Sequence, residues 1–220
     1  MDKYPRTFHL NFSPEIHSDD KVINFKYLGN FLDEEVVITE KLDGGNSCLK
    51  GKEGVFARSH SSQTKDPWFD YLKSKYYQIQ HLIEANEMIF GENMYAIHSI
   101  EYTNLNSFFY IFGYKRDELF LSWDEVERKA KELNFPTVPV LFKGKFKSMT
   151  EIQRWMDEEI EKESVLGGPR EGFVLRVAGQ FHESEFSQNV TKYVREGHVQ
   201  TDEHWSKNWK TAILKKGENE

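Results

Sequence analysis

Residues 36–46 read VVITEKLDGGN, and this stretch decides how the fold around it is interpreted. The β-branched and apolar run at 36–39 predicts a buried strand. The DGGN that follows at 43–46 is typical of a turn that reverses the chain. We therefore expect Lys41 at the end of a strand, facing a pocket, where its amine is a candidate nucleophile.

Lysine is a weak nucleophile at neutral pH, because at its reference pKa of about 10.4 only ~0.04% of the side chain is neutral at pH 7. A nucleophilic Lys41 therefore needs a site that lowers its pKa, and partial burial together with nearby cations does so. The alternative is a solvated hairpin lysine beside a tight Asp43-Gly44 turn. A Lys-x-Asp-Gly tetrad arises by chance in about one in twenty chains of this length, so this segment alone leaves both interpretations open.

The composition restricts the class of protein. At 220 residues the chain is long enough for one sizeable hydrophobic core. The net charge of −7 argues against a uniformly basic coat for nucleic acid, but it is compatible with a local phosphate-facing surface. Cys48 is the only cysteine, which excludes an internal disulfide, and we interpret it as a core residue. The chain has no membrane-spanning stretch and no signal peptide at its start, so we expect a soluble, cytoplasmic protein.

Helical and strand patterns alternate along the chain, which predicts an α+β fold with antiparallel sheets flanked by helices. Helix starts are expected at residues 66–67, 122–125 and 150–153, where capping residues precede helical spacing of apolar side chains. The first of these helices is expected to be long and to reach residue 83. Strands are expected at 54–58, 88–91, 108–114, 118–121, 172–177 and 190–195.

We expect a single domain over residues 1–220, with 197–220 as a short basic C-terminal segment. Trp205 and Trp209 lie four residues apart, which predicts one face of a docking helix in that segment. The aromatic run at 108–112 is more typical of a sheet core than of a platform for a nucleic-acid base, although one of its rings can still stack on a base.

Five further islands follow Lys41, and their order and gaps matter more than any one of them. They are FARS at 56–59, IFGE at 89–92, FYIFGY at 109–114, EGFVLR at 171–176 and VTKYVR at 190–195. In this order they closely resemble the motifs of the covalent nucleotidyltransferase superfamily, which contains DNA and RNA ligases and mRNA capping enzymes. The likeness is greatest to ATP-dependent RNA ligases and extends from residue 4 to about residue 205. It implies a nucleotidyltransferase (ATP-grasp-like ligase) core.

The resemblance implies roles for the residues that would act on phosphate. Lys41 is similar to the lysine that attacks the α-phosphate of ATP, which forms a lysyl-AMP and releases pyrophosphate. Lys192 resembles the lysine that contacts the α-phosphate, and Glu171 the carboxylate that supports a divalent metal. Asn46 resembles a family position near the reacting phosphate.

The resemblance also implies a binding set for the nucleoside. Glu40 is similar to the residue beside the adenine pocket, and Phe112 to the ring that stacks on adenine. Arg58 resembles the arginine that contacts ribose or the 3′-OH end of the nucleic acid. Glu92 resembles the carboxylate that holds a ribose hydroxyl or metal-bound water.

Three carboxylates, Asp43, Glu92 and Glu171, would cluster in such a site only if a cation offset their mutual repulsion. We expect Mg²⁺, with Mn²⁺ as a possible substitute, to be held through its hydration shell. Lys192, Arg195 and this metal are also expected to depress the pKa of Lys41.

Two features depart from the common family pattern. The second lysine of the last motif is replaced by Val194, with Arg195 following it, and Gly113 stands after Phe112 where aspartate is common. Arginine can grip phosphate but does not donate a proton near neutrality, so Arg195 is expected to supply charge at the cofactor site without acid catalysis.

The leading hypothesis is a three-step, ATP-dependent ligase that joins the 3′-OH and 5′-phosphate ends of RNA or of an RNA/DNA hybrid. Too few residues follow Lys192 for the OB-fold domain of DNA ligases and capping enzymes, which favours a minimal RNA ligase over a DNA ligase. The alternatives are a capping-type guanylyltransferase that uses GTP, and a catalytically silent module that binds nucleotide or nucleic acid.

Overall fold

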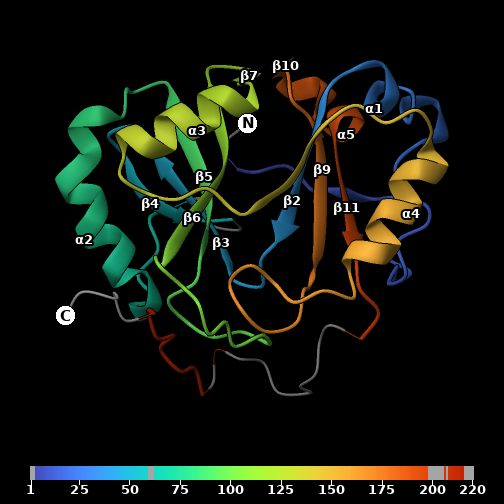
Figure 1. The fold of residues 1–220 in the computed structure, drawn as a ribbon. Helices are drawn as coiled ribbons and strands as arrows, with labels where there is room; N and C mark the ends of the chain where they lie inside the picture. The colour runs from blue at the N-terminus through green and yellow to red at the C-terminus, as the bar shows by residue number, and fades with distance from the viewer. Residues whose placement is uncertain (1–2, 59–61, 198–205, 207, 216–220) are drawn as a thin grey trace.

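The computed structural model describes residues 3–58, 62–197, 206 and 208–215. Two β-sheets stand next to each other in the middle of the molecule, and helices lie on their outer sides (Figure 1). Helices α2 and α3 flank the sheet drawn on the left, and α4 flanks the sheet drawn on the right. The predicted α+β class is confirmed, and the described residues form these two sheets without an OB-fold barrel.

The five-stranded sheet carries the strand that ends at Lys41. Its order is β1 (Phe8–His9), β11 (Val190–Val194), β9 (Gly172–Val177), β2 (Val36–Lys41) and β8 (Val140–Gly144). All neighbours in it are antiparallel except β1 and β11, which run parallel, so the expectation of purely antiparallel sheets is wrong at this edge. The apolar residues of β2 are fully buried, as the sequence predicted.

The six-stranded sheet is antiparallel throughout. Its order is β10 (Phe181–His182), β7 (Leu119–Phe120), β6 (Phe109–Arg116), β5 (Glu87–Asn93), β3 (Gly45–Lys50) and β4 (Gly54–Ala57). All six predicted strands are present, within a few residues of their expected ends. The short strands β1 and β10, and the partly exposed β8, were not predicted, because two-residue strands and exposed edges carry little hydrophobic pattern. Strand β3 was not predicted either, because its first residues, Gly45 and Asn46, were assigned to a turn.

The three predicted helices are present. Helix α2 (Asp70–Ile79) continues at both ends into 3₁₀ turns, η2 (Pro67–Phe69) and η3 (Gln80–Leu82), which together fill the expected long helix. Helix α3 (Trp123–Glu132) begins at Ser122 as expected. The short elements are η1 (Phe25–Tyr27), α1 (Asn30–Asp33), η4 (Glu183–Glu185) and α5 (Phe186–Asn189).

Helix α4 (Met149–Glu159) begins earlier than predicted. Its N-cap is Ser148, whose hydroxyl accepts a hydrogen bond from the Glu151 N–H at 3.2 Å. The Glu151 carboxylate in turn accepts from the Lys147 N–H at 2.7 Å. The Thr150 and Gln153 pair was therefore the wrong choice of cap, because Ser148 has the extended backbone that an N-cap requires and Thr150 is already helical.

The stretch after Lys41 does not form a hairpin. Strand β2 belongs to one sheet and β3 to the other, so residues 42–44 carry the chain across between the sheets. A Cβ on Gly44 would lie 2.8 Å from the Asn93 carbonyl and 2.6 Å from the Met94 sulfur, which explains why only glycine fits this crossing. The solvated hairpin lysine is excluded, and Gly45 and Asn46, which were expected in a turn, begin β3 instead.

Two smaller expectations concern the core and the C-terminal segment. Cys48 is buried, and burial raises the pKa of its thiol to about 12, as befits a core residue. Trp205 lies outside the described residues, but 208–215 is not helical. It pairs instead through isolated bridges to Ala96 and Leu105, which replaces the predicted docking helix. Within the described part of the chain, no helix is long and apolar enough to cross a membrane.

Candidate active site

A cavity of about 600 Å³ opens between the two sheets. On the five-stranded sheet, Lys41 stands opposite Gly172, and Val174 stands opposite both Thr39 and Lys192. Residues opposite one another share a face, and alternate residues along a strand do so too. Lys41, Val174 and Lys192 therefore project from the same face of this sheet, and all three line the cavity.

Strand β6 presents Phe112 to the cavity from the other sheet. Its pairing with β5 is irregular here, because Phe90 pairs with Gly113 and Gly91 pairs with Ile111, which leaves Phe112 as an extra residue. Such a bulge re-aims a side chain. Phe112 lines the cavity and packs edge-on against Tyr4, at 5.0 Å between ring centroids, whereas residues 109–111 are buried core.

The amine of Lys41 lies at the end of β2 and donates a hydrogen bond to Glu171 Oε1. Burial acts to lower the pKa of Lys41, but the carboxylates of Glu171, Glu92 and Asp43 outweigh it, so the pKa is raised. The predicted depression of this pKa is therefore wrong for the site without ligands. The sequence pointed to nearby cations, whereas folding brings carboxylates closest to Nζ.

The predicted acidic residues separate into two groups. Glu171 is buried and Glu92 is partly buried beside Lys41, and desolvation of Glu92 together with Glu171 and Asp43 raises the pKa of Glu92 to about 8. Asp43 does not line the cavity, because its Oδ2 accepts hydrogen bonds from the Ser99 and Ile100 N–H groups at 2.7 and 2.8 Å.

The predicted three-carboxylate metal cluster is not assembled. Among the described residues, no three His, Cys, Asp or Glu side chains come together closely enough to hold a metal ion. Asp43 is committed to the loop at 99–100, which leaves Glu92 and Glu171 facing the Lys41 amine. Desolvation raises the pKa of Glu92 to about 8 although Lys41 favours its charged form, and oxygen ligands such as these two carboxylates suit a hydrated cation.

Glu40 lines the cavity, but its side chain is occupied. The carboxylate accepts from Arg170 Nε at 2.7 Å, from Ser164 Oγ at 2.7 Å and from the Val165 N–H at 3.0 Å. Glu40 thus ties the loop before β9 to the end of β2 and keeps Glu171, the residue after Arg170, next to Lys41. Arg170 was missed in the sequence, where it is an ordinary charged residue ahead of a strand.

The remaining predicted residues lie on the wall of the cavity or just behind it. Asn46, Arg58 and Lys192 all line the cavity, and burial together with Lys41 lowers the pKa of Lys192. Arg195 does not line it, contrary to its predicted place in the cofactor site. Its backbone N–H donates to the Glu171 carbonyl at 3.0 Å, so it anchors the segment that carries Glu171.

The cavity contains residues that sequence reasoning overlooked. Arg176 is buried at its far end, donates to the Leu121 carbonyl at 2.9 Å and lies over the Trp123 ring at 5.6 Å. Its alternation with Val174 along β9 was a usable signal. The N-terminal segment gave no such signal, since it carries no strong secondary-structure pattern. The overlooked lining residues are Tyr4, Arg6, Thr7, Asp19, Asp20, Thr39, Leu42, Gly44, Trp123, Val138 and Arg176.

Comparisons with known proteins agree with this geometry. A family model described as RNA ligase matches residues 34–194. A mutant of Naegleria gruberi RNA ligase with ATP and Mn is 15% identical with a TM-score of 0.58, and the match covers 91% of this chain and 58% of that chain. The same ligase with PPi is 18% identical with a TM-score of 0.56, covering 84% of this chain and 57% of that chain. A putative ATP-dependent DNA ligase from Aquifex aeolicus is 18% identical with a TM-score of 0.53, covering 87% and 49%.

At these identities the structural matches speak for the fold alone, and this chain spans less than two thirds of the length of those proteins. The comparison with curated proteins gave no match. The family model is different in kind, because it aligns the sequence itself over well more than half of the chain, from before β2 to the end of β11. Together with a cavity built around Lys41 between two sheets, this match means that the chain belongs to the RNA ligase family.

Proposed function

We propose that this protein is an ATP-dependent RNA ligase that joins 3′-OH and 5′-phosphate ends through a lysyl-AMP intermediate. The observation that carries the proposal is the contact of the Lys41 amine with Glu171 in a cavity that Lys192 and Arg58 also line. One amine, one adjacent carboxylate and two further cations are the groups that nucleotidyl transfer to lysine requires.

In the first step, Lys41 Nζ attacks the α-phosphorus of ATP. A phosphorus–nitrogen bond forms, the bond from the α-phosphorus to the bridging oxygen breaks, and pyrophosphate leaves. The raised pKa of Lys41 means that the resting amine is protonated, so it has to lose a proton before it attacks. Glu171 Oε1 is already hydrogen-bonded to Nζ and is the group positioned to accept that proton.

In the second step, an oxygen of the 5′-phosphate end attacks the adenylate phosphorus and releases Lys41. In the third, the 3′-OH attacks the activated 5′-phosphate and expels AMP. Asn46, Arg58 and Lys192 supply the hydrogen-bond donors and positive charge that such phosphates need. The family match supports nucleic-acid ends as the substrate, and we propose RNA, or an RNA/DNA hybrid, as their chemistry.

In this proposal, the ATP molecule lies in the cavity with its long axis along the direction of the strands. Phe112 and Val174 line it from opposite sheets, so a flat base inserted between them would stack on the ring and rest on the aliphatic side chain. Val174 lies two residues along β9 from Gly172, which faces Lys41, and this is about 7 Å at the usual rise per residue. The α-phosphate would then lie toward Lys41, as the first step demands.

Glu92 and Glu171 are the residues that would hold Mg²⁺ or Mn²⁺, mainly through bound water. A divalent cation there would neutralise part of the phosphate charge while the amine attacks. It would also favour the ionised form of Glu92, whose pKa is raised to about 8 by desolvation and by the neighbouring Glu171 and Asp43. The N. gruberi ligase structure with ATP and Mn supports this choice of cofactors.

The test is covalent labelling with α-³²P-ATP and Mg²⁺. Wild-type protein should acquire label, and Lys41→Ala should acquire none. Lys50→Ala is the matched control, because Lys50 lies at the far end of β3, pairs with Glu53 at 3.0 Å and does not line the cavity. Equal labelling of wild type and Lys41→Ala contradicts the proposal.

Two further arms separate the alternatives. Label from α-³²P-GTP but not from ATP would select a guanylyltransferase, and tight ATP binding without pyrophosphate release would select a silent binding module. Labelled enzyme should then be chased with nicked duplexes that carry ribose or deoxyribose on each side of the break. Joining that requires ribose next to the break supports RNA ends as the substrate.

A further inference from the structure

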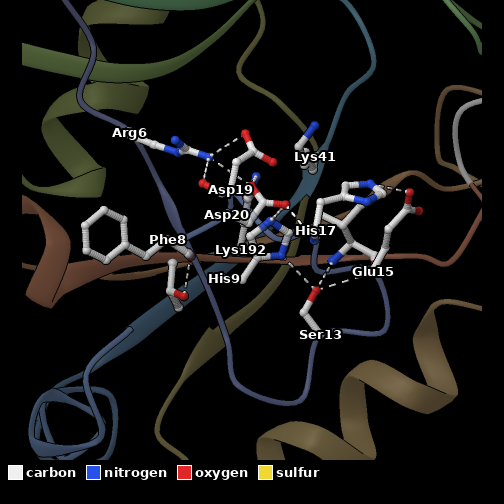
Figure 2. A network of polar contacts seen from close by, with 12 residues as sticks. Arg6, Phe8, His9, Ser13, Glu15, His17, Asp19, Asp20, Lys41 and Lys192 are labelled. Carbon is white, nitrogen blue, oxygen red and sulfur yellow. Dashed lines mark hydrogen bonds and ion pairs between the residues drawn. The ribbon is translucent and has the colours of Figure 1, made fainter. Parts of the chain in front are cut away.

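The segment before residue 34 lies outside the family match, yet it builds one wall of the cavity. Strand β1 runs beside β11 with His9 next to Lys192, and the Leu10 N–H donates to the Lys192 carbonyl at 2.8 Å. The chain then loops out and returns, because the His9 N–H donates to the Lys21 carbonyl and the Ile23 N–H to the His9 carbonyl, each at 2.8 Å. This return brings Asp20 against Lys192, as Figure 2 shows.

A chain of polar contacts then runs from the backbone of β11 to the Lys192 amine. The Val194 N–H donates to Ser13 Oγ at 2.9 Å, and Ser13 Oγ lies 3.1 Å from His9 Nδ1. His9 Nε2 lies 3.3 Å from Asp20 Oδ2, and Asp20 Oδ1 lies 3.9 Å from Lys192 Nζ. These contacts are drawn in Figure 2.

His9 is the central residue of this chain of contacts. It is 2% exposed, and burial together with Lys192 lowers its pKa to about 4, so the ring is neutral at pH 7. Ser13 Oγ accepts from the Val194 N–H, and its own hydrogen can go either to His9 Nδ1 at 3.1 Å or to the Val194 carbonyl at 3.5 Å. His9 Nε2 faces Asp20 Oδ2 at 3.3 Å, a close polar contact that places the neutral ring against one side of that carboxylate.

Asp20 is held from two further sides. Arg6 Nη2 donates to its Oδ1 at 3.2 Å, and the His17 N–H donates to its Oδ2 at 3.1 Å. The Asp20 side chain is 14% exposed and still lines the cavity. Lys192 is in contrast a flexible side chain, and a rigid carboxylate beside it reduces the number of positions that its ammonium explores.

We propose that Asp20 is a positioning residue for Lys192: held by Arg6 and the His17 N–H, and in contact with His9, it orients the Lys192 ammonium toward the phosphate that Lys41 attacks. This inference rests on the proposed function, since it assigns Asp20 to the same nucleotidyl-transfer site. A carboxylate on a phosphate-binding wall repels the bound triphosphate, so it does not serve ground-state binding. Its contribution is made through the placement of Lys192 in the transition state.

Asp20→Asn is the test, with Asp19→Asn as the matched control. Asp19 lines the same wall and is 83% exposed, and its Oδ2 contacts Arg6 at 3.6 Å, but among the described residues it makes no hydrogen bond or ion pair with His9 or Lys192. Both variants remove one negative charge from the wall. Asp20→Asn should lower the maximal rate of enzyme–AMP formation by about tenfold or more, with KM for ATP unchanged or lower. Asp19→Asn should lower KM without that fall in rate.

Two substitutions of His9 provide a second experiment. His9→Gln keeps an N–H that can reach Asp20, whereas His9→Leu keeps the volume and loses the donor. His9→Gln should retain most of the rate, and His9→Leu should behave like Asp20→Asn. An equal rate for Asp20→Asn and Asp19→Asn, or a rise in KM without a fall in maximal rate, overturns the proposal even if His9→Leu fails to fold.

An activity-independent readout separates this proposal from the proposed function. Lys192 in the ligand-free protein can be modified with an amine reagent and quantified by mass spectrometry. Asp20 acts to raise the pKa of Lys192, so Asp20→Asn should speed its modification by about two- to fivefold, and Asp19→Asn should not. No change at Lys192 overturns the positioning role, whereas missing adenylylation of wild type with this change present overturns only the proposed reaction.

Discussion

Glu92 lies in the cavity beside Glu171 and Lys41, where ionisation of its carboxyl group is unfavourable. Its pKa of about 8 means that the neutral carboxyl is the resting form at pH 7. Glu92→Gln imitates that neutral form. We expect the variant to match or exceed the wild-type Tm without ligand at pH 7 and to lose enzyme–AMP formation by about a hundredfold or more, because only the carboxylate compensates a bound cation.

Thermal melts and the labelling assay measure the two halves of this prediction separately. A Tm several degrees below wild type would mean that Glu92 stabilises the fold as a charged group. Retained labelling would remove Glu92 from the cation site.

At the scale of the element, Ser148 caps α4 and Thr150 does not. Ser148→Ala removes the acceptor for the Glu151 N–H and should lower the free energy of unfolding by about 1 kcal/mol. Thr150→Ala, in the first turn of the same helix, should change it by less than about 0.5 kcal/mol. Urea denaturation of the two variants checks this, and equal losses would restore the sequence-based choice of cap.

The contact of β9 with β11 depends on Gly172. A Cβ there would lie 2.1 Å from the Tyr193 carbonyl oxygen, a backbone atom that cannot move aside alone. Gly172→Ala should therefore separate these strands, lower the free energy of unfolding by about 1–3 kcal/mol and slow enzyme–AMP formation, because β11 carries Lys192. Gly179→Ala is the control, since no atom lies within 4 Å of its added Cβ. Urea denaturation and labelling measure both variants, and similar effects would contradict the argument.

At the scale of the whole molecule, a buried charge cluster ties α3 to the six-stranded sheet. Glu87 accepts from Tyr114 and from Arg116, and Lys129 Nζ lies 2.9 Å from its carboxylate. Burial acts to raise the pKa of Glu87, but the hydrogen bonds from Tyr114 and Lys129 outweigh it and lower the pKa from 4.5 to about 2. A depressed carboxyl pKa stabilises the fold above the unfolded value, and this stabilisation is lost as the pH falls from about 4.5 to about 2.

Glu87→Gln tests this at the same scale. At pH 7 the variant should be less stable than wild type, because the buried Lys129 ammonium loses its buried carboxylate partner and keeps only the more exposed Glu132, at 3.2 Å, as an acidic partner. Between pH 4.5 and 2 the two proteins should converge, since wild type loses the ionised carboxyl there. Free energies of unfolding measured at several pH values check the convergence, and parallel curves would contradict it.

The local sequence was sufficient to predict most of the helices and strands. The apolar run before Lys41, the spacing of apolar residues in α2 and the cap of α3 are properties of neighbouring residues, so they could be predicted. The candidates for the cavity other than Lys41 came from the resemblance to RNA ligases rather than from local patterns, and Lys41, Asn46, Arg58, Glu92, Phe112 and Lys192 all line the cavity. Their roles in the reaction stay predictions until the labelling experiments are done.

The sequence by itself determined the strand that presents Lys41 and the set of charged residues available to it. Only the tertiary structure decided which charges meet: Glu171 contacts Lys41 from 130 residues away, and Asp43 turns to backbone N–H groups. It also decided that Asp20 reaches Lys192. The physical reason is that strand and helix patterns depend on neighbours along the chain, whereas pKa values and ion pairs depend on distance and burial, which arise only when the sheets pack.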